Sequence, residues 1–212
     1  MKPDTIPPCL APSLFQKVLL ATDGTVGEIL QVFAGEPIRV CKLSQEVGAS
    51  AETAPVLNVA EHDQVLRRTV LLKGGRSGTP YIYAESSIRV DVLDPALLDA
   101  LCSTDISIGQ LLRNRRQETF REILASGWDE AGECALHFAI EPWDLLLWRT
   151  YRIVVANEPM MLITEKFPAH GALRQPGVTA AASSERALIL DDAARLGPHH
   201  PRVASKSILA GP

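Results

Sequence analysis

The chain of 212 residues is 46% apolar and 22% charged, a balance that is usual for one globular domain with a substantial core. Its formal net charge of −4 gives no general attraction to nucleic acid or to an anionic membrane, so we expect neither as a partner. Arg is much commoner than Lys. Because a guanidinium grips a planar carboxylate with two parallel hydrogen bonds, anionic small molecules remain open as ligands.

The cysteines and the N-terminus bear on the cell compartment. The four cysteines, Cys9, Cys41, Cys102 and Cys134, are far apart, with no C-x-x-C pair and no histidine at zinc-finger spacing. This distribution is typical of reduced thiols and does not indicate a metal site. The start MKPDTIPPCLAPS has no apolar run behind a basic residue, and no segment is long enough to span a bilayer. We therefore expect a cytoplasmic protein.

The first part of the chain is predicted to form two short helices and three strands. Apolar residues recur at helical spacing in PSLFQKVLLATDG and in TVGEILQVFAGEP, which ends at Gly35. Alternating patterns predict strands in IRVCKLSQEV, VLRRTVLLKG and YIYAESSIRVDVL, and the turn-rich GGRSGTP joins the last two as a hairpin. We expect GASAETAP, between the first two strands, to be a loop.

The second part is predicted to form two further helices, a strand and another hairpin. DPALLDALCS is typical of a helix with an Asp cap and Pro95 in its first turn, and DISIGQLLRNRR of a short helix with a glycine near its start. QETFREILASGW fits a helix or a strand, and we favour the strand. WRTYRIVVA, the turn NEP and MMLITEKF form the hairpin, whereas we expect DEAGECALHFAIEPWDLLL to be an irregular inserted lid or loop.

Together these elements predict an α+β domain over residues 1–168, with a single antiparallel sheet of about six strands flanked by helices. Residues 169–212 are rich in Ala, Pro, Gly and Ser. We expect them to be a partly disordered tail with one short helical stretch. We find no internal repeat, and we expect a monomer or a homodimer.

Two charged residues stand on strand faces that are otherwise apolar. With a period of two, Glu165 shares a face with Met161, Ile163 and Phe167, and Arg68 shares a face with Leu66, Val70 and Leu72. One interpretation is a buried structural ion pair between Arg68 and Glu165, which is the commoner case for such a pair. The other is a pocket with a guanidinium at one end and a carboxylate at the other. The spacing alone does not choose between them.

Other candidate ligand-binding groups give weaker signals. Gly109 near the start of a helix would let a ligand approach the free backbone N–H groups there, although Ser107 could equally be a simple N-cap. Arg149 and Arg152 fall on opposite faces of their strand, so at most one of them is expected to face a pocket.

In this order, the pieces resemble the chorismate pyruvate-lyase (4-hydroxybenzoate synthase) family, above all its actinobacterial branch. The similar stretches are LLATDGTVGEILQVFAGEPIRV, VLRRTVLLKG, YAESSIRVDVL, DISIGQLLRNRRQETF and RTYRIVVANEPMMLITEKF, which cover roughly residues 14–168. The resemblance implies one antiparallel sheet with flanking helices that enclose the ligand.

The resemblance also implies roles for particular residues. The family's substrate-gripping arginine falls on Arg68 in RTVLL, and its pocket carboxylate falls on Glu165 in PMMLITE, which has one extra residue relative to the family pattern. The backbone donors fall on Ile108 and Gly109 in SIG, and we include Arg152 among the substrate-binding candidates. Arg68 and Glu165 are then the expected catalytic residues.

The implied activity is the elimination of pyruvate from chorismate to give 4-hydroxybenzoate, with no cofactor and no metal. An intramolecular hydrogen transfer is chemically possible, in which case the protein mainly positions the substrate. The alternatives are a non-catalytic binder of chorismate or hydroxybenzoate, as in effector-sensing domains of transcription regulators, and a lyase that yields another hydroxybenzoate isomer. Only residues 1–13 precede the similar region, so we do not expect a helix-turn-helix domain there.

Overall fold

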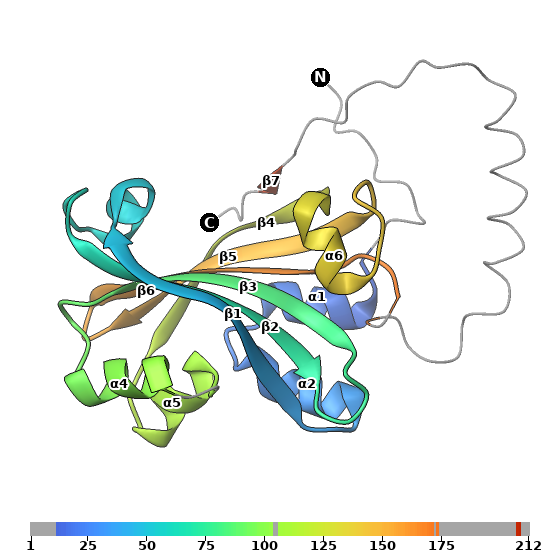
Figure 1. Cartoon of the computed structure of the whole chain (residues 1–212), viewed down its shortest axis with the longest axis horizontal. Helices are drawn as coiled ribbons and strands as arrows, with labels where there is room; N and C mark the ends of the chain where they lie inside the picture. Colours follow the sequence, from blue (N-terminus) through green and yellow to red (C-terminus); the bar gives the residue numbers. More distant parts are fainter. Residues whose placement is uncertain (1–11, 104–105, 172, 174–206, 209–212) are drawn as a thin grey trace, which may run out of the picture.

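A twisted antiparallel sheet forms the centre of the computed structural model, which describes residues 12–103, 106–171, 173 and 207–208 (Figure 1). The strand order is β1-β2-β3-β6-β5-β4-β7. The strands are β1 (Ile38–Ala49), β2 (Gln64–Gly74), β3 (Pro80–Arg89), β4 (Phe120–Glu130), β5 (Leu145–Val155), β6 (Glu158–Pro168) and the short β7 (Ser207–Ile208). The predicted α+β fold with one antiparallel sheet is confirmed, as are both predicted hairpins and the strand favoured for β4.

The longer helices cover one face of the sheet (Figure 1). The helices are α1 (Leu14–Ala21), α2 (Val26–Ala34), α3 (Ala54–Leu57), α4 (Pro95–Ser103), α5 (Ile108–Asn114) and α6 (Ala135–Phe138). Two apolar clusters lie on that face, one beneath α1 and α2 and the other beneath α4 and α5. A third cluster joins α6 to the opposite face through Leu71 and Leu146. No helix in the described part of the chain is long and apolar enough to cross a membrane.

Two segments that were expected to be irregular contain short helices. The first residues of GASAETAP are the last of β1. The segment then forms a single 3₁₀ turn, η2 (Ala51–Thr53), which continues directly into α3. The expected lid before Trp148 likewise contains η3 (Gly132–Cys134) and α6, which pack on the sheet. Both predictions were wrong because a four-residue helix is too short to show a 3.6-residue period.

The fold contains an internal duplication, which corrects the expectation of no repeat. The order α1-α2-β1-η2-α3-β2-β3 is repeated as α4-α5-β4-η3-α6-β5-β6. Strands β1 and β4 carry a register shift at equivalent places, between Lys42 and Ser44 in β1 and between Ile123 and Ala125 in β4. Sequence similarity between the halves is confined to short stretches such as TDGTVGEIL (22–30) and TDISIGQLL (104–112). The two halves meet where β3 pairs with β6.

The segment after β6 continues to contact the domain. The Gln16 amide donates hydrogen bonds to the carbonyl oxygens of Pro168 and Ala169 at 2.9 and 3.0 Å. Ala169 and Leu173 are buried in the cluster beneath α1 and α2. The rest of the predicted tail lies outside the described residues, apart from β7, which pairs with β4.

Candidate active site

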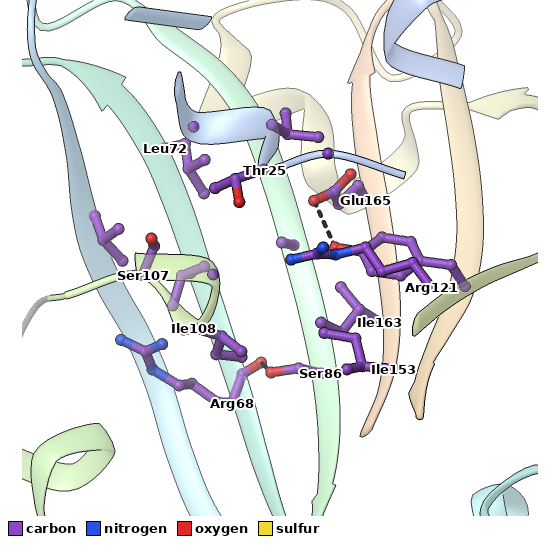
Figure 2. Close-up of a pocket in the computed structure, with 18 residues that line it drawn as sticks. Thr25, Arg68, Leu72, Ser86, Ser107, Ile108, Arg121, Ile153, Ile163 and Glu165 are labelled. Atoms are coloured by element: carbon purple, nitrogen blue, oxygen red, sulfur yellow. Dashed lines mark hydrogen bonds between the residues drawn. The ribbon is translucent and has the colours of Figure 1, made fainter. Parts of the chain in front are cut away.

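The site is a cavity between the helix-covered face of the sheet and the first turns of α2 and α5 (Figure 2). The empty space between them is about 600 Å³, with the solvent at its open side included. The helical side consists of residues 24–27 and 107–109. The sheet contributes Val40, Arg68, Val70, Leu72, Ala84, Ser86, Arg121, Tyr151, Ile153, Ile163 and Glu165.

The first turns of the two helices are in direct contact at the cavity. A Cβ atom on Gly109 would lie 2.8 Å from Cγ2 of Thr25, so glycine is required for this close approach. The Ser107 hydroxyl accepts a hydrogen bond from the Gln110 N–H at 3.2 Å, which confirms that Ser107 caps α5. Ile108 and Gly109 follow the cap and line the cavity. N–H groups in a first helical turn have no acceptor within their own helix, so the amides of these two residues are potential donors to a ligand.

Arg68 lies at one end of the cavity, beside Ser107 and Ile108 (Figure 2). The side chain is only 2% exposed, and its Nη2 is 3.4 Å from the carbonyl oxygen of Ile106. The Ser86 hydroxyl donates to the Arg68 carbonyl oxygen at 3.1 Å, which ties β3 to β2 at this point. The predicted orientation of Arg68 toward the covered face of the sheet is therefore confirmed.

Glu165 lies in a different part of the cavity and has its own buried partners. Its carboxylate accepts hydrogen bonds from Nε of Arg149 at 2.8 Å and from the Tyr151 hydroxyl at 3.0 Å. Nη1 of Arg149 donates to the Thr22 carbonyl oxygen at 2.7 Å. The buried ion pair considered from the sequence therefore exists, but its arginine is Arg149 and not Arg68.

Tyr151 contributes a protonated phenol to this cluster. Burial, and next the negative charge of Glu165, raise the pKa of the Tyr151 hydroxyl well above its ordinary value. The phenol is thus neutral at physiological pH and acts as a hydrogen-bond donor to Glu165. The carboxylate of Glu165 is fixed from two directions, while one side of it still borders the cavity.

The structure separates the two arginines of β5. Arg149 is fully buried on the cavity side, whereas Arg152 lies on the opposite face. There, Arg152 forms a 2.6 Å ion pair with Glu122 and contacts the carbonyl oxygen of Val56. The cavity therefore brings together Arg68, Ile108, Gly109 and Glu165, but not Arg152, because successive strand residues alternate between faces. The proposed substrate-binding role of Arg152 is not supported by this position.

Sequence reasoning did not select two further arginines of the site. Arg149 was not chosen because the alternation does not say which face of β5 is covered. Arg121 lines the cavity near the start of β4, in a stretch for which helix and strand were both open. The internal duplication could have identified Arg149. Arg68 and Arg149 stand at the same distance from the starts of their strands, Gln64 for β2 and Leu145 for β5, so the two arginines occupy equivalent places.

The α+β fold of this chain also occurs in solved structures of low sequence identity. PhnF from Mycobacterium smegmatis has a similar structure with a TM-score of 0.58 and 12% sequence identity, over 70% of this chain and 65% of that one. A possible transcriptional regulator from Bacillus subtilis, YydK, gives a TM-score of 0.53 and 16% identity, over 71% and 64%. At these identities the likeness concerns the fold alone.

Sequence comparison identifies the family. The family described as "Chorismate pyruvate-lyase Rv2949c-like" matches residues 20–174, and the chain belongs to this family. A protein named chorismate pyruvate-lyase from Mycobacterium leprae is 34% identical over 154 residues, which are 71% of this chain and 72% of the relative. The protein of the same name from Mycobacterium tuberculosis is 30% identical over 159 residues, 71% and 78% of the two chains. The family inferred from the motifs is confirmed, and with it the expectation of a lyase.

Proposed function

We propose that this chain eliminates pyruvate from chorismate and releases 4-hydroxybenzoate. The observation that carries the proposal is a cavity with an apolar middle, in which Arg68 and Glu165 stand apart and do not neutralise each other. A ring acid with a carboxylate at one end and a hydroxyl at the other matches this arrangement. Membership of the family supports the same substrate.

The proposed binding mode assigns one end of the substrate to each half of the site. The ring carboxylate contacts the Arg68 guanidinium and the N–H groups of Ile108 and Gly109, which together supply charge-assisted hydrogen bonds. The ring hydroxyl donates to Glu165, whose position is fixed by Arg149 and Tyr151. The ring itself lies between aliphatic side chains of the sheet.

In this reaction every atom of the two products comes from chorismate, and no second reactant is needed. The ether C–O bond between the ring and the enolpyruvyl group breaks, and the hydrogen on the ring carbon that bears the hydroxyl moves to the enolpyruvyl methylene. The methylene becomes the methyl group of pyruvate, and the ring becomes aromatic. Because the gain of aromaticity makes the step strongly favourable, the protein is required to hold a compact conformer and to stabilise charge that develops at the ether oxygen.

Glu165→Gln tests the role assigned to the carboxylate. The substitution preserves the shape of the side chain and one acceptor but removes its charge, so we expect kcat to fall about ten- to a hundredfold with a smaller change in KM. The measurement is steady-state turnover of chorismate at several concentrations. A variant with a raised KM and an unchanged kcat would reduce Glu165 to a binding residue.

Gly27→Leu tests whether the space beside α2 is occupied by the ligand. A Cβ atom on Gly27 would meet nothing within 4 Å, and the residue lines the cavity. We expect the leucine to weaken 4-hydroxybenzoate binding about tenfold or more by steric exclusion, without loss of stability, since Gly costs roughly 0.5–1 kcal/mol relative to better helix formers. Calorimetric titration measures the affinity. Gln31→Leu, an exposed site on the same helix, is the matched control, and equal affinities of the two variants would contradict this placement of the ligand.

Direct turnover tests the function itself. Purified protein is incubated with chorismate, and the mixture is separated by chromatography with standards for the hydroxybenzoate isomers and for pyruvate. We expect 4-hydroxybenzoate and pyruvate in equal amounts. Release of a different isomer would correct the product, and tight binding of chorismate without any product would leave a binding protein in place of an enzyme.

A further inference from the structure

Arg121 is a cavity-lining arginine without an assigned role. Its Nη1 donates to the carbonyl oxygen of Asp23 at 2.9 Å, which leaves other donors of the guanidinium available. Among the residues that the structure describes, no ion pair includes Arg121. The neighbouring Glu122 is engaged on the other face of the sheet by Arg152. Arg121 therefore presents a positive charge to the cavity that no carboxylate of this part of the chain neutralises.

The internal duplication places an aliphatic residue at the equivalent position of the first half. Arg121 pairs with Ile153 in the second half, and Val40 pairs with the equivalent Leu72 in the first half. Val40 is buried in the apolar cluster beneath α2. Packing beneath the helix is thus achieved by an aliphatic side chain in the first half. This favours a role in ligand binding for the charge of Arg121 in the second half.

Arg121 and Arg68 are in different parts of the cavity. In Figure 2 the Arg68 guanidinium lies beside Ile108, whereas Arg121 extends toward the side that carries Glu165. The positive charge of Arg121 is also close enough to Tyr151 to oppose the rise in the pKa of its phenol. The site therefore contains two separated cationic groups, which suits a ligand with two separated carboxylates.

The chemistry of chorismate indicates which carboxylate each arginine receives. The hydroxyl is on the ring carbon para to the ring carboxylate, and the enolpyruvyl ether is on the adjacent carbon, meta to that carboxylate. If the hydroxyl contacts Glu165, the enolpyruvyl arm starts at the neighbouring ring carbon, within reach of the Glu165 side of the cavity. That is the side to which Arg121 extends.

We propose that Arg121 binds the enolpyruvyl carboxylate and makes the site selective for a dicarboxylate over the monocarboxylate product. The inference rests on the proposed function. It implies that Arg121 contacts the substrate before cleavage and the departing pyruvate afterwards, whereas 4-hydroxybenzoate has no group for it. Arg121 also borders a second, more open hollow shared with Arg113 and Arg116, through which the pyruvate arm faces the exterior.

The test compares substrate and product in two variants, Arg121→Met and Arg116→Met. Arg116 lines only the outer hollow and is the matched control. For Arg121→Met we expect KM for chorismate to rise about tenfold or more, the usual consequence of losing a hydrogen bond to a charged group. The Kd of 4-hydroxybenzoate, measured by calorimetric titration, should change less than about twofold. Both quantities should stay near wild type in Arg116→Met.

Arg121→Lys should restore part of the affinity for chorismate, because the charge is retained. If Arg121→Met does not fold, Arg121→Gln replaces it. An unchanged KM for chorismate, or equal weakening of chorismate and 4-hydroxybenzoate binding, would overturn the inference.

If wild-type protein does not cleave chorismate, the proposed function fails. The same comparison is then made with chorismate as an unreacted ligand, and it still decides whether Arg121 selects the second carboxylate.

Discussion

Arg68→Ala is expected to lower kcat/KM for chorismate by about a hundredfold to a thousandfold, the loss that follows when one partner of a buried charged contact is removed. The guanidinium is almost fully enclosed at one end of the cavity, where water does not easily replace it as a partner for the ring carboxylate. The binding of 4-hydroxybenzoate should fall as well, since that carboxylate is retained in the product. Turnover and calorimetric titration measure the two effects.

Arg67→Ala is the matched control for this experiment. Arg67 is the next residue on β2 but points to the other face, where it is exposed and contacts Glu46 and the Ala49 carbonyl oxygen. We expect its removal to leave activity near the wild-type value, because exposed ion pairs contribute little to stability. Wild-type turnover by Arg68→Ala, or equal losses in both variants, would remove Arg68 from the mechanism.

Arg149→Met is expected to destabilise the protein by about 3–5 kcal/mol, because it leaves the buried Glu165 carboxylate without its charged partner. Arg149 is 0% exposed, and it joins Glu165 on β6 to the Thr22 carbonyl oxygen after α1. Activity should also fall, since Glu165 is no longer held in one orientation. Urea denaturation at neutral pH measures the change in the free energy of unfolding.

Two comparisons separate charge from packing in this prediction. Combining Arg149→Met with Glu165→Gln should recover part of the lost stability, since the unpaired charge is removed; a double-mutant cycle gives the coupling. Arg152→Ala breaks a partly exposed pair on the same strand and should cost about 0–1 kcal/mol with activity retained. A loss of stability in Arg149→Met no larger than in Arg152→Ala would contradict the structural role given to Arg149.

The alternation of apolar residues predicted the sheet and the orientation of Arg68 and Glu165, because a period of two directly assigns side chains to faces. It did not identify the partner of Glu165. Strand pairing across β5 and β6 brings Arg149 opposite Glu165, and single-strand patterns carry no information on which strands are neighbours. Arg152 was chosen in its place, although it lies on the other face.

The internal duplication carries information on two site arginines, Arg149 and Arg121, that the strand patterns did not identify. Aligning TDGTVGEIL with TDISIGQLL would have shown that the chain contains two similar halves. Continued toward the C-terminus with a gap of one residue, that alignment relates Arg149 to Arg68 and Arg121 to Val40. The short helices α3 and α6 could not have been found from periodicity, because each comprises a single turn.

The most direct test of the account is a crystal structure of the protein with 4-hydroxybenzoate bound. We predict the ligand within the cavity, its carboxylate in hydrogen-bond contact with the Arg68 guanidinium and with the amides of Ile108 and Gly109. Its phenol oxygen should lie within hydrogen-bond distance of Glu165. A ligand bound in the reverse orientation, or bound only in the outer hollow beside Arg113 and Arg116, would contradict the assignment of the two ends of the site.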